Sequence, residues 1–536
     1  MGFIDGRIRG IEYEYAIDTH PSLTSSILRN RVISSAIMGL KEQGYISEVD
    51  WSIDDEIGNL EYEQGLPALW MAPVGPFEAA LNGSRVYNDA EHFEVSTPAY
   101  RTPFDAVVYD KVGEIFAYWG AKATEKEFRR VFAYKNNVST TVSDGRFESV
   151  TYGTHSCISL DRRVCNIDRW DEVERALVPY MVSRIPLIGG GEYVTCTKEG
   201  KKLEFVFPHL GAPTVAGNSA VFTISPRSAF LKRISALDTS LMRGILNLRD
   251  EPHANPEKYW RLHDINWEAA RNEFHIFVRD VLQVFVMCAF ERGLLDDAPR
   301  LRDPLNSAME VSLDTEDYNW RVELADGRRV DCVSEILDGF YLAKIEEMVS
   351  QEEASAQDKM ALDILKATVQ KLSERSLEYL FNGIDWITKK LLVVEYEPST
   401  TMEAIGLCNE FSLVDDCVEF YVGKGVNFDE CDSRFDPRES LAFAKDAAPI
   451  PDWDRLIDRI QTGLTEGPSD TREYFRSSVL KKFPNDIRKI SWWKVYFEGE
   501  VIELPEPFDL NKQESRELVE KASSAGELLT ELGRKK

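Results

Sequence analysis

Residues 82–98 read Asn-Gly-Ser-Arg-Val-Tyr-Asn-Asp-Ala-Glu-His-Phe-Glu-Val-Ser-Thr-Pro. Asn82-Gly83 is typical of a tight hairpin turn between two strands. Alternation along these strands would gather a guanidinium, a phenol, two carboxylates and a hydroxyl, which could bind a metal–phosphate and act on a carbonyl. The alternative is a solvated hairpin edge. The side chains concerned are Arg85, Tyr87, Asp89, Glu94 and Thr97.

The chain opens with a second candidate strand, Arg7 to Ile17, that alternates from Ile11 onward. Alternation predicts that Glu12 and Glu14 share one face. Two carboxylates on a buried strand repel each other and lose hydration, so they need a cation between them, and Mg²⁺ with nucleotide phosphates is the natural candidate. The alternative is an exposed edge strand, because a single Glu-x-Glu motif is weak.

Composition excludes several classes of protein. The chain has 536 residues, with 63 Lys and Arg against 91 Asp and Glu, a net charge of −28. This charge argues against a nucleic-acid binder and against adhesion to an anionic membrane. No apolar run approaches the ~20 residues of a spanning helix, and the N-terminus lacks a signal peptide's order. We therefore expect a cytoplasmic protein.

The eight cysteines are scattered, without a CxxC motif or a Cys/His quartet at zinc spacing. Free thiols in a reducing compartment are expected, and any metal should be a hard ion held by oxygen ligands rather than zinc.

Two further segments carry dense polar groups. Asn247 to His263 packs arginines, acids and histidines into a short stretch, which suits phosphate and metal contact, although a solvated loop is the alternative. His155 follows Tyr152-Gly-Thr, and a lone histidine beside a tyrosine is more often structural than a ligand.

Several of these motifs together resemble the family that contains the Pup ligase and the Pup deamidase/depupylase. These are glutamine-synthetase-like, ATP-binding enzymes that act on prokaryotic ubiquitin-like protein (Pup). The resemblance spans nearly the whole chain. The motifs are Gly10 to Tyr15, Asn82 to Asp89, His92 to Glu94, Tyr134 to Asn137, Tyr152 to His155, Arg249 to His263, Asp470 to Arg476 and Ser491-Trp492.

The resemblance implies roles for individual residues. Asp89 would be the catalytic carboxylate, and ATP with Mg²⁺ would be the cofactors. The implied Mg²⁺ ligands are Glu12, Tyr87 and Glu94, with Glu14 and His155 as further ligands. The implied nucleotide contacts are Arg85, Thr97, Arg249 and Trp492.

The implied partner is a Pup-like modifier with its lysine-linked conjugates. The long segment between Glu14 and Arg85, and the sequence from Thr102 to Glu114, look closer to the depupylase branch. We therefore expect an amide (isopeptide) hydrolase or deamidase. The alternatives are an ATP-dependent carboxylate–amine ligase on the same fold and a nucleotide-binding pseudo-enzyme.

The chain also departs from the family's pattern. Ser156-Cys157 stands where the family has Glu-Asn, Phe93 where it has Pro, and Asn255 where it has Asp, and the acidic motif near Glu419 looks altered. These changes indicate a divergent member. If the missing glutamate ligates metal or contacts substrate, this chain lacks that component.

The expected fold is α+β. A large, curved antiparallel sheet with helices on one face would cradle the nucleotide, as in glutamine synthetase, and a small C-terminal α/β domain would close one side. We predict a catalytic domain over residues 1–430 and the C-terminal domain over 451–536, with a linker between. The acidic, irregular residues 47–81 would form an inserted lid.

Overall fold

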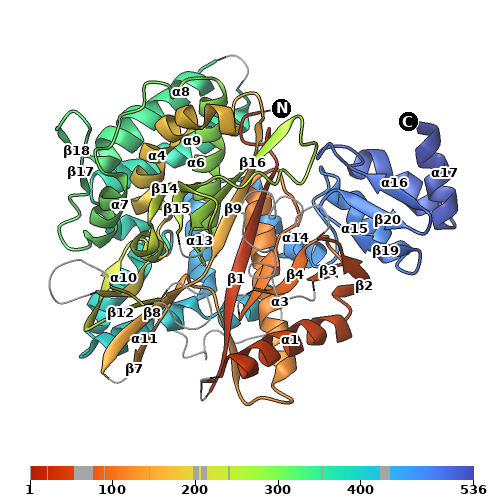
Figure 1. Cartoon of the computed structure of the whole chain (residues 1–536), viewed down its shortest axis with the longest axis horizontal. Coiled ribbons are helices and arrows are strands. Elements are labelled where there is room, and N and C mark those ends of the chain that lie inside the picture. The colour runs from red at the N-terminus through yellow and green to blue at the C-terminus, as the bar shows by residue number, and fades with distance from the viewer. Residues whose placement is uncertain are drawn as a thin grey trace.

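The computed structural model describes the chain except for residues 1, 21, 24, 54–76, 90, 144, 197–203, 207–213, 240–241, 352–353, 423–434 and 536. Figure 1 shows a large body of helices and strands with the C-terminal segment as a smaller lobe at one end. Among the described residues, every helix is too short or too polar to cross a lipid bilayer.

An eleven-stranded sheet runs through the described part of both lobes, and most of its neighbouring strands are antiparallel. β6 (Val131–Tyr134) pairs with β1 beside the main path. The strands along that path are, in order, β16 (Tyr259–Trp267), β9 (Thr154–Asp161), β1 (Arg9–Thr19), β5 (His92–Ser96), β4 (Arg85–Asp89), β3 (Phe77–Ala80), β2 (Ile46–Trp51), β19 (Ile487–Ile490), β20 (Lys494–Phe497) and β21 (Glu500–Glu503).

Strand β1 shows why this sheet has one apolar and one polar face. Along β1 the odd-numbered residues are buried and the even-numbered ones are only partly buried. Tyr13 donates a hydrogen bond to Asp110 of α3 (Pro103–Thr124) and accepts one of 3.1 Å from Arg279 of α6 (Glu273–Glu291). The odd-numbered side chains of β1 therefore face the helices α3 and α6, and the even-numbered ones face the opposite side.

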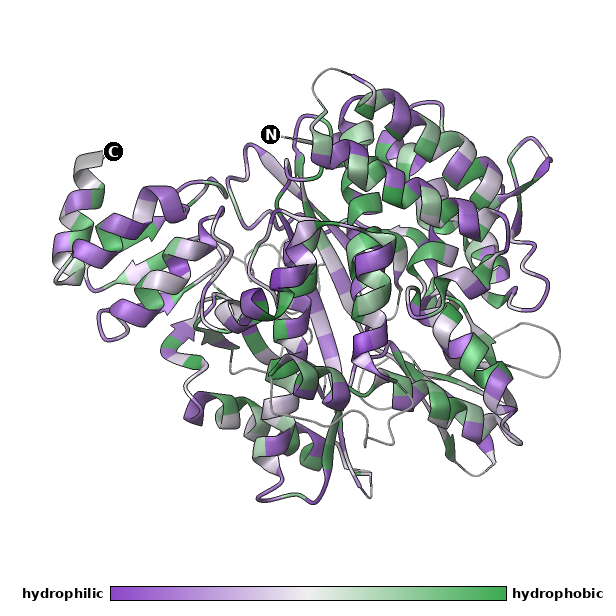
Figure 2. Cartoon of the chain, turned by 180° about the vertical axis from the view of Figure 1, so that it is seen from behind, coloured by the Kyte–Doolittle hydropathy of each residue, from purple (hydrophilic) through white to green (hydrophobic). Residues whose placement is uncertain are grey.

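Helices α3 and α6 pack together at the centre of the main core, and α1 (Ser26–Glu42) packs on α3. The outer helices are banded in Figure 2, where hydrophilic and hydrophobic residues alternate along each of them, as in amphipathic helices that cover a core. The other α-helices described in the large body are α4 (Trp170–Ser183), α5 (Ile185–Ile188), α7 (Pro304–Leu313), α8 (Ala343–Val349), α9 (Ala356–Ser373), α10 (Asp385–Tyr396), α11 (Thr401–Ser412), α12 (Asp415–Tyr421), α13 (Pro437–Ala447) and α14 (Leu456–Gly463).

Smaller sheets flank the main one. Strands β11, β12, β8 and β7 form a four-stranded sheet, and three two-stranded pairs complete the described strands. Their bounds are β7 (Val138–Ser143), β8 (Arg146–Thr151), β10 (Glu192–Cys196), β11 (Glu204–Val206), β12 (Thr214–Gly217), β13 (Ser219–Thr223), β14 (Arg233–Ala236), β15 (Gly244–Asn247), β17 (Arg321–Glu323) and β18 (Arg329–Asp331).

The C-terminal lobe shares its sheet and its core with the N-terminal half of the chain. β19 pairs in parallel with β2. Val49, Trp51 and Ala79 of β2 and β3 belong to the same apolar cluster as Phe475 and Trp492. Helices α15 (Glu473–Lys482), α16 (Lys512–Lys521) and α17 (Ala525–Lys535) complete this lobe.

The predicted α+β fold, with a large and mainly antiparallel sheet and helices on one face, is confirmed. Two predicted boundaries were wrong. The ends of the segment 47–81 are not irregular, because they form β2 and β3, while its centre lies outside the described residues. The start of the C-terminal domain at 451 is too early, because Trp453, Leu456 and Ile460 pack in the core of the large body.

A close approach between α3 and β1 generates the first prediction. A Cβ atom added to Gly113 of α3 would lie 2.9 Å from the Tyr15 hydroxyl, whereas one added to Gly406 of α11 would meet nothing within 4 Å. Gly113→Ala should therefore lower the free energy of unfolding by about 1–3 kcal/mol through overpacking. The better helix propensity of alanine should raise it by about 1 kcal/mol.

The measurement is the melting temperature of both variants by differential scanning calorimetry. We expect Gly406→Ala to melt above the wild type and Gly113→Ala to melt below Gly406→Ala. Equal shifts of the melting temperature in the two variants would show that Gly113 of α3 does not pack closely against Tyr15 of β1.

Candidate active site

Strand register gathers acidic side chains on the face of the sheet away from α3 and α6. Glu12 of β1 lies opposite Ser96 of β5 and His155 of β9, and Glu14 lies opposite Glu94 of β5. Directly opposite residues of antiparallel strands project from the same face. The alternation predicted for Glu12 and Glu14 is therefore present, and this strand lies inside the sheet, not at an exposed edge.

Asp89, the last residue of β4, completes a cluster of three carboxylates, which we call the acidic cluster. One carboxylate oxygen from each of Glu14, Asp89 and Glu94 lies within 4.8 Å of the other two. Tyr87 lies opposite Glu94 and donates a hydrogen bond to it. All potential ligand atoms here are oxygens, which Mg²⁺ prefers.

The electrostatics of the acidic cluster favour a bound cation. Burial, with repulsion from Glu14 as the next cause, raises the pKa of Asp89 to about 7. Burial and the neighbouring carboxylates raise the pKa of Glu94 well above its usual range. Buried carboxylates whose charged form is this unfavourable are relieved by a cation between them. The residues present therefore fit a divalent cation.

Glu12 lies in a different electrostatic environment. Burial works to raise its pKa, but hydrogen bonding with His155 and His263 and the charges of His263 and Arg261 hold it well below its usual range. The Oε2 atom of Glu12 lies 3.3 Å from Nδ1 of His155 and 3.5 Å from Nε2 of His263. Of the five predicted metal ligands, Glu12 and His155 thus contact each other, whereas Glu14 and Glu94 belong to the acidic cluster and Tyr87 is hydrogen-bonded to Glu94.

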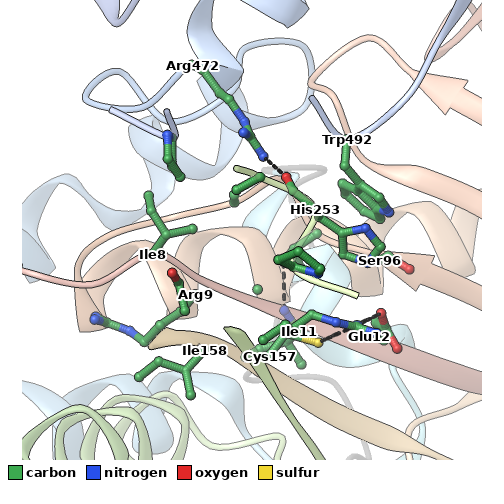
Figure 3. A pocket seen from close by; sticks show the side chains of 18 residues that line it. Ile8, Arg9, Ile11, Glu12, Ser96, Cys157, Ile158, His253, Arg472 and Trp492 are labelled. Atoms are coloured by element: carbon green, nitrogen blue, oxygen red, sulfur yellow. Dashed lines mark hydrogen bonds and ion pairs between the residues drawn. The ribbon is translucent and has the colours of Figure 1, made fainter. Parts of the chain in front are cut away.

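A cavity of ≈ 590 Å³ opens beside Glu12, between the sheet and the C-terminal lobe (Figure 3). Thr97 and Trp492, two of the predicted nucleotide contacts, line it together with His253 and Arg472. The rings of Trp492 and His253 lie 5.5 Å apart, and Arg472 donates a 2.6 Å hydrogen bond to the carbonyl of His253.

The predicted arginines lie between the cavity and the acidic cluster. The guanidinium carbon of Arg85 lies 4.4 Å from the ring centroid of Tyr87 and 5.4 Å from that of Trp492. The Nε atom of Arg249 lies 3.9 Å from Oε1 of Glu251, and the charge of Arg249 opposes the rise in the pKa of Asp89. An anionic ligand that reached from the cavity to Asp89 would therefore meet the positive charge of both arginines.

Thr97 also has a structural role, and the polar segment 247–263 is not entirely a loop. The hydroxyl oxygen of Thr97 accepts a 3.0 Å hydrogen bond from the Ile11 amide, so this oxygen also helps to join β1 to the segment that follows β5. Only part of the polar segment is a loop, because it continues into β16 at Tyr259. Asp250 does not join the site, since it forms hydrogen bonds of 2.8 and 2.6 Å with Arg162.

The structure also shows how the two residues that differ from the family pattern, Ser156 and Cys157, lie relative to the site. Ser156 projects toward α6, where it donates a 2.8 Å hydrogen bond to Oε1 of Gln283. Cys157 projects toward the site, with Sγ 3.1 Å from Nη1 of Arg261. Burial raises the pKa of the Cys157 thiol to about 12. The substituted residue that meets the site is therefore Cys157, not Ser156.

Two buried arginines, Arg227 and Arg243, were not predicted as site residues, because they belong to no recognisable motif. Arg243 is 3% exposed, and its Nη1 atom has no hydrogen-bond partner. Burial, followed by the charge of Arg227, lowers the pKa of Arg243 well below its usual range, while Glu14 opposes this shift. A partly unpaired guanidinium in this position provides a second contact for an anion near the acidic cluster.

Comparisons with known proteins match most of the chain. The family model described as Pup-ligase protein matches residues 7–407. A depupylase of Acidothermus cellulolyticus is 27% identical over 552 residues, covering 98% of this chain and 99% of that protein. A Pup deamidase/depupylase of Mycolicibacterium smegmatis is 28% identical with the same coverage. A Pup–protein ligase of Acidimicrobium ferrooxidans is 29% identical over 58% of this chain and 63% of that protein.

The fold is similar to that of a solved complex between prokaryotic ubiquitin-like protein Pup and its ligase PafA. The TM-score is 0.68 at 19% identity, covering 98% of this chain and 94% of that chain. The Pup ligase PafA in complex with ADP gives a TM-score of 0.63 at 20% identity, covering 87% of this chain and 93% of that one.

The repulsion inside the acidic cluster generates a prediction about stability. Glu94→Gln removes one buried charge, and the new amide oxygen can still accept the hydrogen bond from Tyr87. We expect the metal-free variant to melt higher than the wild type, by roughly 2–4 °C for each kcal/mol of repulsion relieved. The variant should gain less than the wild type when Mg²⁺ is added.

The control is Glu500→Gln on the exposed strand β21, which should leave both melting temperatures unchanged. The account of the acidic cluster fails if Glu94→Gln retains the full stabilisation by Mg²⁺.

Proposed function

This chain belongs to the Pup-ligase family, and from that premise we propose that it is an ATP- and Mg²⁺-dependent hydrolase of amide or isopeptide bonds formed by a Pup-like modifier. The observation that carries the proposal is the acidic cluster of Glu14, Asp89 and Glu94 beside a cavity lined by Thr97 and Trp492. The proposed partners are the modifier and its lysine-linked conjugates, as the names of the relatives suggest.

We assign the ≈ 590 Å³ cavity to the nucleotide. The rings of Trp492 and His253 offer aromatic surface to a base, and Arg85 provides positive charge toward the phosphates. The solved complex of a related ligase with ADP supports this assignment at the level of the ligand class. Since ATP is a cytoplasmic metabolite and six of the cysteines are free thiols, we assign the enzyme to the cytoplasm.

We propose that Glu14, Glu94 and Tyr87 hold the Mg²⁺ that accompanies the nucleotide, with Glu12 and His155 at the boundary with the cavity. When bound, Mg²⁺ supplies positive charge that orients phosphate oxygens and polarises the reacting carbonyl. The remaining chemistry belongs to the side chains of this chain.

Asp89 is the proposed catalytic residue. Its raised pKa of about 7 suits a group that takes up a proton near neutral pH. Asp89 would accept a proton from water as the water oxygen attacks the amide carbonyl carbon. It would then return this proton to the nitrogen when the carbon–nitrogen bond breaks, which releases ammonia or the lysine amine. Arg249 and Arg243 would stabilise the oxyanion.

Hydrolysis is favoured over ligation by the pattern of relatives. The depupylase and deamidase relatives match 98% of this chain and 99% of their own length, whereas the ligase relative matches 58% of this chain. Ligation remains the second candidate, because the ligase–Pup complex shares the fold over 98% of the chain. In that reaction a phosphorylated carboxylate would accept the lysine amine, with Asp89 as the base.

The proposal is tested with Mg-ATP, the purified protein and a lysine-linked Pup conjugate, measuring the released target protein by electrophoresis. We expect release by the wild type. Asp89→Asn should lose at least about 100-fold in rate, because the general base is removed. Nucleotide binding, measured by calorimetry, should be retained, since Asp89 does not line the cavity.

Asp363→Asn, on the exposed side of α9, is the matched control and should release the target at the wild-type rate. Formation of new conjugate with stoichiometric ADP would replace hydrolysis by ligation. If the protein binds nucleotide but catalyses neither reaction, with Asp89→Asn indistinguishable from the wild type, the chain is a pseudo-enzyme.

A further inference from the structure

Three charged side chains at the start of α15 are buried where the C-terminal lobe meets the large body. Arg472, Glu473 and Arg476 are 3%, 0% and 0% exposed. Glu473 forms an ion pair with Arg476, and its Oε1 atom lies 3.6 Å from Nε of Arg472. We call these three residues the α15 cluster.

The α15 cluster is a costly arrangement for a protein core. It holds two cations and one anion, and among the described residues the Nε and Nη2 atoms of Arg476 have no hydrogen-bond partner. Burial lowers the pKa of Arg472 to about 10, although the charge of Glu473 opposes this shift. Buried ion pairs can often be exchanged for apolar side chains without loss of stability, so stability is a weak reason for such a cluster. A role in fixing the position of neighbouring elements accounts for it better.

The two arginines of the cluster support the wall of the nucleotide cavity. Arg472 lines this cavity and donates hydrogen bonds of 2.6 Å to the carbonyls of His253 and Leu504 (Figure 3). The guanidinium carbon of Arg476 lies 5.9 Å from the ring centroid of Trp492, which also lines the cavity. The α15 cluster therefore contacts the side chains that would meet a bound nucleotide.

Glu473 contacts the turn between β3 and β4. A Cβ atom added to Gly83 would lie 3.1 Å from Oε2 of Glu473, so the carboxylate packs directly on this turn. Gly83 has a φ of 91°, in the left-handed region where only glycine is free of strain. Asn82 is also held, because its Nδ2 atom donates a 2.8 Å hydrogen bond to the carbonyl of Gly463. The turn that precedes β4 is therefore fixed by both α14 and α15.

Strand β4 connects this turn to the proposed catalytic residue. It begins at Arg85 and ends at Asp89. Because a paired strand moves as a unit, a displacement of the turn would also displace Asp89. A misplacement of ~1 Å at a reacting group can lower the rate about 100-fold.

We propose that Glu473 is a positioning residue that joins β4 to the nucleotide cavity, so that a nucleotide bound there holds Asp89 in its reactive position. This inference rests on the proposed function, from which it takes the roles of Asp89 and of the cavity. Glu473 is not among the residues that line the described cavity, and it acts only through its contacts with the turn and with the two arginines.

The test uses Glu473→Gln in the full chain, with ADP as the ligand and a lysine-linked Pup conjugate as the substrate. In the wild type, ADP should slow hydrogen–deuterium exchange of residues 82–89, because a segment that is held opens less often. Glu473→Gln should lose this slowing but retain its affinity for ADP, measured by calorimetry. Its kcat should fall by about 10- to 100-fold with KM unchanged, which a loss of stability alone would not produce.

The matched control is Glu498→Gln in the same lobe, where the side chain is exposed and its ion pair with Arg488 contributes little. It should leave the exchange, the affinity and kcat unchanged.

Gly83→Ala tests the same contact from the side of the turn and leaves all three charges of the α15 cluster in place, so it decides the matter if Glu473→Gln does not fold. Its control is Gly327→Ala in the turn between β17 and β18, which has a φ of 88° and no atom within 4 Å of an added Cβ. Both variants bear the same backbone strain, but only Gly83→Ala should lower kcat and abolish the effect of ADP on residues 82–89.

The proposal is overturned if ADP slows the exchange of residues 82–89 equally in the wild type and in the folded variants, or if kcat and ADP affinity fall together. A wild type that shows the ADP effect without cleaving any conjugate would support the role of Glu473 while contradicting the proposed hydrolysis. A wild type that does not bind ADP would contradict both.

Discussion

The alternation of side chains along β1 is the constraint on which the rest of the structure depends. Its odd-numbered residues pack against α3 and α6, where Tyr13 is bonded to Asp110 and Arg279. This packing leaves the even-numbered residues, Glu12 and Glu14, on the opposite face. A shift of register by one residue would exchange the two faces. The helices therefore determine where the acidic side chains point.

The site carries an electrostatic cost that the fold must support. Three carboxylates of the acidic cluster lie on neighbouring strands, and the pKa values of Asp89 and Glu94 are raised mainly by burial. Such an arrangement destabilises the metal-free protein, and functional sites commonly bear this cost. The surrounding sheet, which is continuous with the C-terminal lobe through β2 and β19, holds the cluster together.

Much of this site could be predicted from the sequence, because its elements are local. The Asn82-Gly83 turn and the alternation of Arg85, Tyr87 and Asp89 depend only on neighbouring residues. The remaining features depend on tertiary pairing. Cys157 meets His263 only through the register of β9 with β16, and Ser156 is removed from the site by the same alternation. The role of β2 was hidden because its pairing partner, β19, lies more than 400 residues away in the sequence.

The most direct test is a crystal structure of the protein with ADP and Mn²⁺ in place of Mg²⁺, recorded at the manganese absorption edge. The account predicts an anomalous peak among Glu14, Asp89 and Glu94, and the nucleotide in the cavity lined by Trp492 and Thr97. A nucleotide bound elsewhere, or an acidic cluster without manganese in the presence of bound ADP, would contradict it.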